Sequence, residues 1–192
     1  MPRPPRADEA GAVYHALNRG NARQPIFFKD ADYEAFERLI AEGLEKFPVD
    51  LISYQWMPNH WHMVLSPQTD GGMSAFVGWI TLTHTQRYHA HHHTTGYGHV
   101  YQGRYKSFPI QDDEHFHTVC RYVERNALTA KLVDRAEDYR WGSLYNWCGG
   151  SSPLTLSKWP VKRLPNWVQR VNEALSENEH ARLRECVSRS VP

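Results

Sequence analysis

The chain has 192 residues, enough for one domain of ordinary size with an appended segment and a substantial core. Its 22 basic and 21 acidic residues nearly cancel, so net charge alone does not identify a polyanionic partner. The three scattered cysteines form no Cys-x-x-Cys pair, and the chain has neither a long apolar run nor the apolar region of a signal peptide. A disulfide scaffold and a membrane span are therefore excluded, and we expect a soluble cytoplasmic protein.

The first predicted element is a strand over residues 12–17, which ends at a turn that carries cations. The turn Asn18-Arg19-Gly20-Asn21 is followed closely by Arg23. A bare glycine N–H beside a guanidinium suits close approach to a phosphate, although an ordinary surface turn is the alternative. Helical spacing of apolar residues then predicts an amphipathic helix over residues 30–47, to which we assign no chemistry.

Two histidines flank one apolar residue in the stretch Met57-Pro58-Asn59-His60-Trp61-His62. Residues 51–56 have the pattern of a strand and Pro58-Asn59 has turn chemistry, so the histidines open the second strand of a hairpin. Side chains on a strand alternate between faces, so both imidazoles project from one face and Trp61 from the other. Such a pair is half of a metal site, and two ordinary strand histidines are the alternative.

A second helix is predicted from Gly71 to the run of histidines that ends at His93. Consecutive helical residues point in different directions, so we interpret His91–His93 as a polar helix end rather than a metal site. Residues 100–110 then read as an alternating strand on which Arg104 and Lys106 share one face. Their interleaving with aromatic rings favours nucleic-acid binding, and a solvated strand face is the alternative.

The third predicted helix, over residues 112–133, carries the second half of a candidate site. Tyr122 and Asn126 are four residues apart and lie on one helix face, beside a basic row of Arg121 and Arg125. The Asn126 carbonyl oxygen, added to two imidazoles, suits Mg²⁺ or Mn²⁺. Tyr122 would then present its phenol to a phosphate, helped by the positive field, because a free phenol with a pKa of about 10 is a weak nucleophile. A core tyrosine is the alternative.

Taken together, these segments resemble the REP-associated tyrosine transposases, a branch of the single-tyrosine HUH transposase superfamily of bacterial insertion sequences. Their order and spacing agree from about residue 10 to residue 145. The matching segments are Tyr14-His15, Arg19-Gly20-Asn21, Met57-Pro58-Asn59-His60-Trp61-His62, Gln102-Gly103-Arg104-Tyr105-Lys106-Ser107, Arg121-Tyr122-Val123-Glu124-Arg125-Asn126 and Tyr139-Arg140-Trp141-Gly142-Ser143.

The resemblance implies an α/β fold of the α+β type, a ferredoxin-like antiparallel sheet with flanking helices. It also implies that His60, His62 and Asn126 bind the Mg²⁺ or Mn²⁺ ion. Tyr122 would be the nucleophile that cleaves single-stranded or hairpin DNA at palindromic repeats, leaving a 5′-phosphotyrosine link and a free 3′-hydroxyl. The residues expected to contact this DNA are Arg19, Asn21, Arg23, Arg104, Lys106, Arg121 and Arg125.

Two positions depart from the family pattern, which usually has Pro where Ala127 stands and a serine pair where Gly142-Ser143 holds one serine. We expect a transposase-like domain over residues 10–147 and a linker with two short helices over 148–192, in a monomeric or homodimeric, nucleoid-associated protein. One alternative is a domesticated hairpin-binding protein without strand cleavage. Another is a histidine-rich zinc protein unrelated to DNA.

Overall fold

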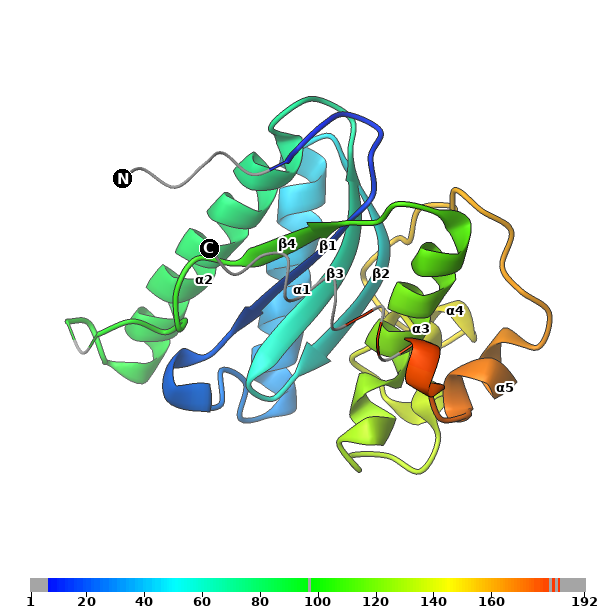
Figure 1. Ribbon diagram of the computed structural model, residues 1–192. Helices are drawn as coiled ribbons and strands as arrows, with labels where there is room; N and C mark the ends of the chain where they lie inside the picture. The colour runs from blue at the N-terminus through cyan, green and yellow to red at the C-terminus, as the bar shows by residue number, and fades with distance from the viewer. Residues whose placement is uncertain (1–6, 97, 180, 182, 184–192) are drawn as a thin grey trace.

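A four-stranded antiparallel sheet carries helices on both of its faces (Figure 1). The computed structural model of the protein describes residues 7–96, 98–179, 181 and 183. The strands are β1 (Tyr14–Arg19), β2 (Val49–Met57), β3 (His60–Pro67) and β4 (Lys106–Pro109). The helices are α1 (Asp30–Lys46), α2 (Gly72–His92), α3 (Asp113–Thr129), α4 (Ser143–Trp147) and α5 (Trp167–Asn172), with short 3-10 turns at η1 (Asn21–Arg23) and η2 (Ala136–Asp138).

The order of the strands in the sheet is β2-β3-β1-β4, with antiparallel pairing throughout. Along the chain, the sheet is built from strand, helix, strand, strand, helix and strand. This is the ferredoxin-like arrangement, so the fold class predicted from the sequence is confirmed. Among the described residues, no helix is both long and apolar enough to span a bilayer.

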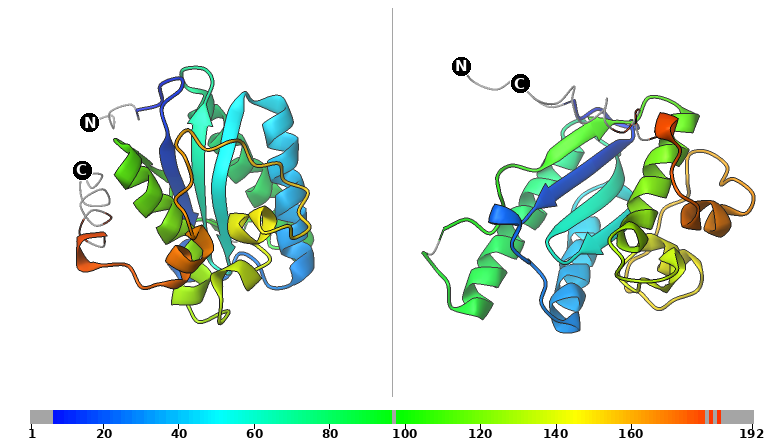
Figure 2. Two further views of the ribbon diagram at one scale, coloured as in Figure 1. Left: turned by 90° about the vertical axis from the view of Figure 1, so that its right-hand side faces the viewer. Right: turned by 60° about the horizontal axis from the view of Figure 1, so that its bottom comes forward.

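The two faces of the sheet are covered by different helices (Figure 2). Helices α1 and α2 pack on one face over the larger core, which includes Trp61 and Met63 of β3. Helix α3 packs on the other face over a second core, which includes Val64 of β3. The predicted alternation along β3 is therefore confirmed, and it assigns His60 and His62 to the α3 face.

The hairpin that carries the two histidines has the predicted turn. Met57 of β2 pairs with His60 of β3, so Pro58 and Asn59 form the connection between the two strands. The ends of α1 and α2 lie within one residue of their predicted positions. Helix α3 continues through Ala127 but ends at Thr129, four residues before the predicted end at residue 133. His91–His93 close the C-terminal end of α2, where basic side chains suit the negative end of the helix dipole.

The strand predicted over residues 100–110 is much shorter in the structure, since β4 covers only Lys106–Pro109. The alternation fails because Tyr101 turns into the core of the α1/α2 face. Its hydroxyl accepts a hydrogen bond from Trp61 Nε1 (3.2 Å) and lies 2.7 Å from His84 Nδ1. The first strand is also displaced, so Arg19 belongs to β1 and the turn begins at Gly20.

The segment 139–143 lies along the outer edge of β2. Trp56 N donates to Trp141 O (2.9 Å), and the Tyr139 hydroxyl donates to Trp56 O (2.8 Å). A Cβ atom on Gly142 would lie only 2.2 Å from Gln55 Oε1, so a larger residue at this departure from the family pattern would require the end of the Gln55 side chain to shift.

A buried carboxylate fixes α3 against the sheet. Glu124 of α3 is 1% exposed, and its oxygens accept hydrogen bonds from Ser53 of β2 (3.4 Å), Ser143 of α4 (2.8 Å) and Trp167 of α5 (2.6 Å). Burial raises the pKa of Glu124, while the nearby charge of Arg163 and these hydrogen bonds oppose that shift. One carboxylate thus joins four elements of the chain.

The C-terminal extension packs against α3. Helix α5 confirms the first of the two short helices expected there, and its Trp167 and Val171 are buried in the core beneath α3. Much of the second predicted helix lies outside the described residues.

Replacing Glu124 tests how much its buried hydrogen bonds contribute to the free energy of unfolding. We expect Glu124→Ala to lower the free energy of unfolding by about 3–5 kcal/mol, because it leaves buried donors and the Arg163 charge uncompensated. Glu124→Gln keeps an acceptor and should cost less. The control Asp113→Ala, on the exposed first turn of α3, should cost about 1 kcal/mol or less. Urea unfolding measures all three, and equal effects of Glu124→Ala and Asp113→Ala would contradict the assignment.

Candidate active site

The four residues that the sequence placed at one site lie together between β3 and α3. Asn126 Nδ2 of α3 is 3.0 Å from His62 Nε2 of β3. The Tyr122 ring, one helical turn earlier, meets the His62 ring edge-on with centroids 5.5 Å apart. The His60 and His62 rings are 5.0 Å apart. Strand and helix periodicities therefore bring two imidazoles, an amide and a phenol to one place.

Two further side chains hold the histidines and received no role from the sequence. His15 Nε2 of β1 lies 2.9 Å from His62 Nδ1. Asn59 Oδ1 lies 2.6 Å from His60 Nδ1, and Asn59 Nδ2 donates to Arg23 O (3.0 Å). The signal for His15 was present in the sequence, because alternation along β1 puts it on the face that also carries Arg19.

The imidazoles of the site are neutral at physiological pH. Burial, followed by the charge of Arg19, lowers the pKa of His60 to about 4, against a weaker opposing effect of the Asn126 hydrogen bond. Burial lowers the pKa of His62 well below 6.5, with smaller contributions from the charges of His15, His60 and Arg19. Burial and then the charge of His115 lower the pKa of His15 to about 3. Neutral rings keep a lone pair for a metal ion.

The environment of Tyr122 acts on its phenol in opposite directions. Burial raises the pKa of Tyr122 above its ordinary value of 10.0, whereas the Arg19 charge and the Asn126 hydrogen bond lower it. Arg19 is directly opposite His60 in the β1–β3 pairing, so its side chain shares the face of the site. The guanidinium thus supplies a positive charge beside the phenol.

The donor set fits a hard or borderline divalent ion. Two neutral imidazoles and the Asn126 side chain converge, and a half-turn of the amide exchanges its N–H group for its carbonyl oxygen at the same position. Mixed nitrogen and oxygen ligation of this kind suits Mg²⁺ or Mn²⁺. Within the described part of the chain, no group of three or more His, Cys, Asp or Glu side chains is arranged to bind a metal.

Over more than half of its length, the chain matches a known protein family. The model of the family described as "Transposase IS200 like" matches residues 10–126, a span that contains His60, His62, Tyr122 and Asn126. The chain belongs to the IS200-like transposase family. The family predicted from the sequence is therefore confirmed. No curated protein sequence matches this transposase significantly.

A solved structure of low sequence identity shares its fold. A REP-associated tyrosine transposase bound to a REP hairpin superposes with a TM-score of 0.64 at 16% identity, covering 83% of this chain and 96% of that chain. A Deinococcus radiodurans R1 protein provisionally named a transposase gives a TM-score of 0.46 at 16% identity, covering 64% of this chain and 95% of that chain.

The residues predicted to contact DNA fall into separate groups in this transposase. Lys106 and His62 both pair with Leu17 of β1, so Lys106 is exposed on the site face with Arg19. Asn21 and Arg23 are exposed in the η1 turn beside the hairpin. Arg104 lies before β4 begins and lines a groove with Gly78 and Leu82 of α2, so alternation does not place it beside Lys106.

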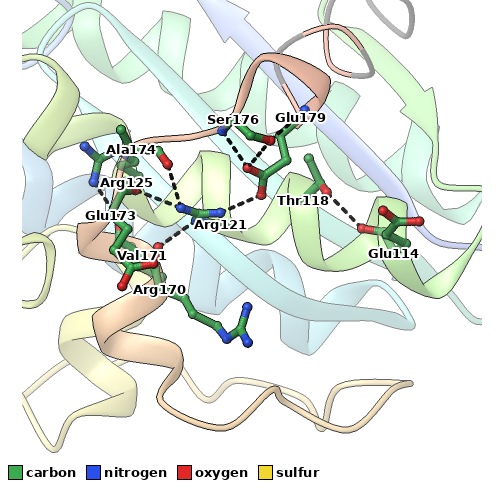
Figure 3. A network of polar contacts seen from close by, with 10 residues as sticks. All are labelled: Glu114, Thr118, Arg121, Arg125, Arg170, Val171, Glu173, Ala174, Ser176 and Glu179. Atoms are coloured by element: carbon green, nitrogen blue, oxygen red, sulfur yellow. Dashed lines mark hydrogen bonds and ion pairs between the residues drawn. The ribbon is translucent and has the colours of Figure 1, made fainter.

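Arg121 and Arg125 hold the C-terminal extension (Figure 3). Arg121 donates to Arg170 O (2.6 Å), Glu173 O (2.9 Å), Ala174 O (2.9 Å) and the Glu179 carboxylate (2.6 Å), and Arg125 donates to Val171 O (2.8 Å). These carbonyls lie in the last turn of α5 and just beyond it, where cations are favoured. In this structure Arg121 therefore bonds to the extension through all three of its guanidinium nitrogens, and Arg125 through one.

We expect Arg121→Ala to release α5 from α3 and to lower stability by about 2–3 kcal/mol, because four hydrogen bonds to a charged group are lost. Hydrogen exchange of the α5 amides should accelerate. The control Arg135→Ala removes a guanidinium that is 62% exposed and paired with Glu137, and it should change stability by about 0.5 kcal/mol or less. Unchanged α5 exchange in Arg121→Ala would show that α5 is held by its apolar contacts alone.

Proposed function

We propose that this transposase cleaves and rejoins single-stranded or hairpin DNA, with Tyr122 as the nucleophile and Mg²⁺ or Mn²⁺ as the cofactor. The observation that supports the proposal is the position of Tyr122 and Asn126 of α3 over His62 of β3. A purely structural tyrosine would have no need of two neutral, convergent imidazoles and an amide beside its ring.

In the proposed step, Tyr122 Oη attacks a phosphodiester, forming a bond from tyrosine oxygen to phosphorus as the bond to the 3′ oxygen breaks. The phenol loses its proton and the departing 3′ oxygen takes one up, so the reaction involves no net proton or electron transfer. The product is a 5′-phosphotyrosine link and a free 3′-hydroxyl. Because one ester replaces another, the reverse attack by a 3′-hydroxyl can rejoin the strand.

The divalent ion would be held by His60, His62 and Asn126. Both histidines are already neutral at pH 7, so neither has to lose a proton before the ion binds. The ion would supply a positive charge that polarises the phosphate and favours the developing negative charge. Arg19 adds a second positive charge beside Tyr122, which favours the phenolate over the phenol.

The proposed substrate is a DNA hairpin with a single-stranded flank. The REP-associated tyrosine transposase with the same fold is bound to a REP hairpin, and this chain presents Arg19, Lys106, Asn21 and Arg23 near the site. Contacts of Arg19, Arg23 and Lys106 with phosphates would make binding weaken steeply with salt. Arg104 would contact DNA outside this group, and Arg121 and Arg125 would do so only if their bonds to the extension opened.

One chain supplies all four groups of the proposed site, so a monomer is sufficient for the reaction. We propose that residues 10–147 form the transposase domain and that 148–192 are an extension that supports α3. We also propose that the protein acts on chromosomal DNA in the cytoplasm, as its substrate requires.

Tyr122→Phe separates a strand transferase from a hairpin-binding protein that does not cleave. With a labelled hairpin from the flanking genome and Mn²⁺, we expect wild type to form a covalent adduct, seen as a shifted band after denaturing electrophoresis. Tyr122→Phe should form none while its hairpin affinity stays within about twofold, because only one oxygen is removed. The control Tyr88→Phe, on α2, should retain the adduct. Adduct formation by Tyr122→Phe, or its absence in wild type, would contradict the proposal.

The pH profile provides an independent test. Since burial raises the pKa of Tyr122 above its ordinary value, the phenolate fraction should rise about tenfold per pH unit between pH 7 and 9. Single-turnover adduct formation should follow the same slope at saturating Mg²⁺. A rate that stays flat over this range would contradict a reaction limited by loss of the Tyr122 proton.

A further inference from the structure

His15 of β1 contacts the proposed metal ligand His62 inside the protein. Its Nε2 lies 2.9 Å from His62 Nδ1, and the two ring planes differ by 22°. His15 is 5% exposed and His62 is 2% exposed, so water does not compete for this contact. Two uncharged imidazoles at this distance share one hydrogen bond, in which one ring donates and the other accepts.

In the orientation that the structure gives the Asn126 amide, its contact with His62 indicates which ring donates. The Asn126 Nδ2 group donates to His62 Nε2, so that nitrogen is the acceptor and carries no proton. The single ring proton of His62 is then on Nδ1, which donates to His15 Nε2. An unprotonated Nε2 is also what metal ligation by this nitrogen requires.

His60 has a parallel arrangement with a different partner. An amide oxygen only accepts hydrogen bonds, so His60 Nδ1 carries a proton and donates to Asn59 Oδ1 at 2.6 Å. The bond from Asn59 Nδ2 to Arg23 O fixes the orientation of that amide. Both histidines of the site therefore have an acceptor at Nδ1.

We infer that His15 is a positioning residue that fixes the ring orientation and tautomer of His62, so that His62 Nε2 is presented to the ion. The inference rests on the proposed function, because the ion belongs to that site. Partners that hold the remote nitrogen of a ligating histidine commonly change metal affinity about 10- to 100-fold when removed. Nothing else on β1 offers an acceptor in this position, since the next residue on the same face is Leu17.

The experiment compares His15→Leu, which removes the acceptor, with His15→Gln, whose carbonyl oxygen replaces it near the position of Nε2. The first readout is long-range ¹H–¹⁵N NMR of the metal-free protein, which reports which nitrogen of His62 carries the proton. We expect the Nδ1–H form in wild type and His15→Gln, and a mixture with the Nε2–H form in His15→Leu. The second readout is the Mn²⁺ dissociation constant, which should rise about 10- to 100-fold in His15→Leu and only a few-fold in His15→Gln.

His84→Leu is the matched control, because it removes another buried histidine, on the opposite face of the sheet, whose partner is Tyr101. It should change neither readout.

If the His62 tautomer and the Mn²⁺ affinity are both unchanged in His15→Leu, the inference about His15 is wrong while the proposed metal site stands. If His15→Leu and His15→Gln lose Mn²⁺ affinity equally, His15 has only a packing role and the inference is also wrong. If wild type bound no Mn²⁺ through His60 and His62, the proposed metal site would fail and the inference with it. Should His15→Leu not fold, the wild-type and His15→Gln tautomers still decide, since a His62 Nε2–H form in either contradicts it.

Discussion

The position of α3 on the sheet depends on one buried carboxylate. Glu124 faces the sheet, where Ser53, Ser143 and Trp167 donate to it from three different elements. Burying a carboxylate is unfavourable unless its hydrogen bonds and charge are compensated, so few other placements of this helix are possible. Arg163, which stacks on Trp159 with a distance of 3.8 Å to the ring centroid, contributes the compensating charge. The helix that carries Tyr122 is thus held by the extension as well as by the sheet.

With α3 fixed in this way, the site follows from two periodicities. Residues two apart on β3 share a face, so His60 and His62 both point to α3. Residues four apart on α3 share a face, so Tyr122 and Asn126 both point to β3. The site is therefore the crossing of one strand face and one helix face. His15 and Asn59 contact the Nδ1 atoms of the two imidazoles, and these contacts restrict the orientation of both rings.

The part of this arrangement that could be predicted from the sequence is the part set by local spacing. Alternation and helical periodicity were sufficient for the His60/His62 pair and the Tyr122/Asn126 pair, and the order of motifs was sufficient for the ferredoxin-like fold. Contacts between segments that are distant along the chain could not be predicted from local spacing. Tyr101 leaves the expected strand because His84 and Trp61 bind its hydroxyl in the core. The basic row of Arg121 and Arg125 pairs with carbonyls about fifty residues later, which helix periodicity does not reveal. The partners of Glu124 were hidden for the same reason.

In the proposed reaction, one ion and one phosphodiester meet between β3 and α3. An anomalous difference map tests this directly, from crystals of the Tyr122→Phe variant, which should not cleave, grown with Mn²⁺ and an intact hairpin. We expect a single strong peak at about 2.0–2.3 Å from the Nε2 atoms of His60 and His62 and from the Asn126 carbonyl oxygen, with a DNA phosphate bound to it. A peak at His91–His93 with nothing at His60 and His62, or a phosphate bound far from residue 122, would contradict it.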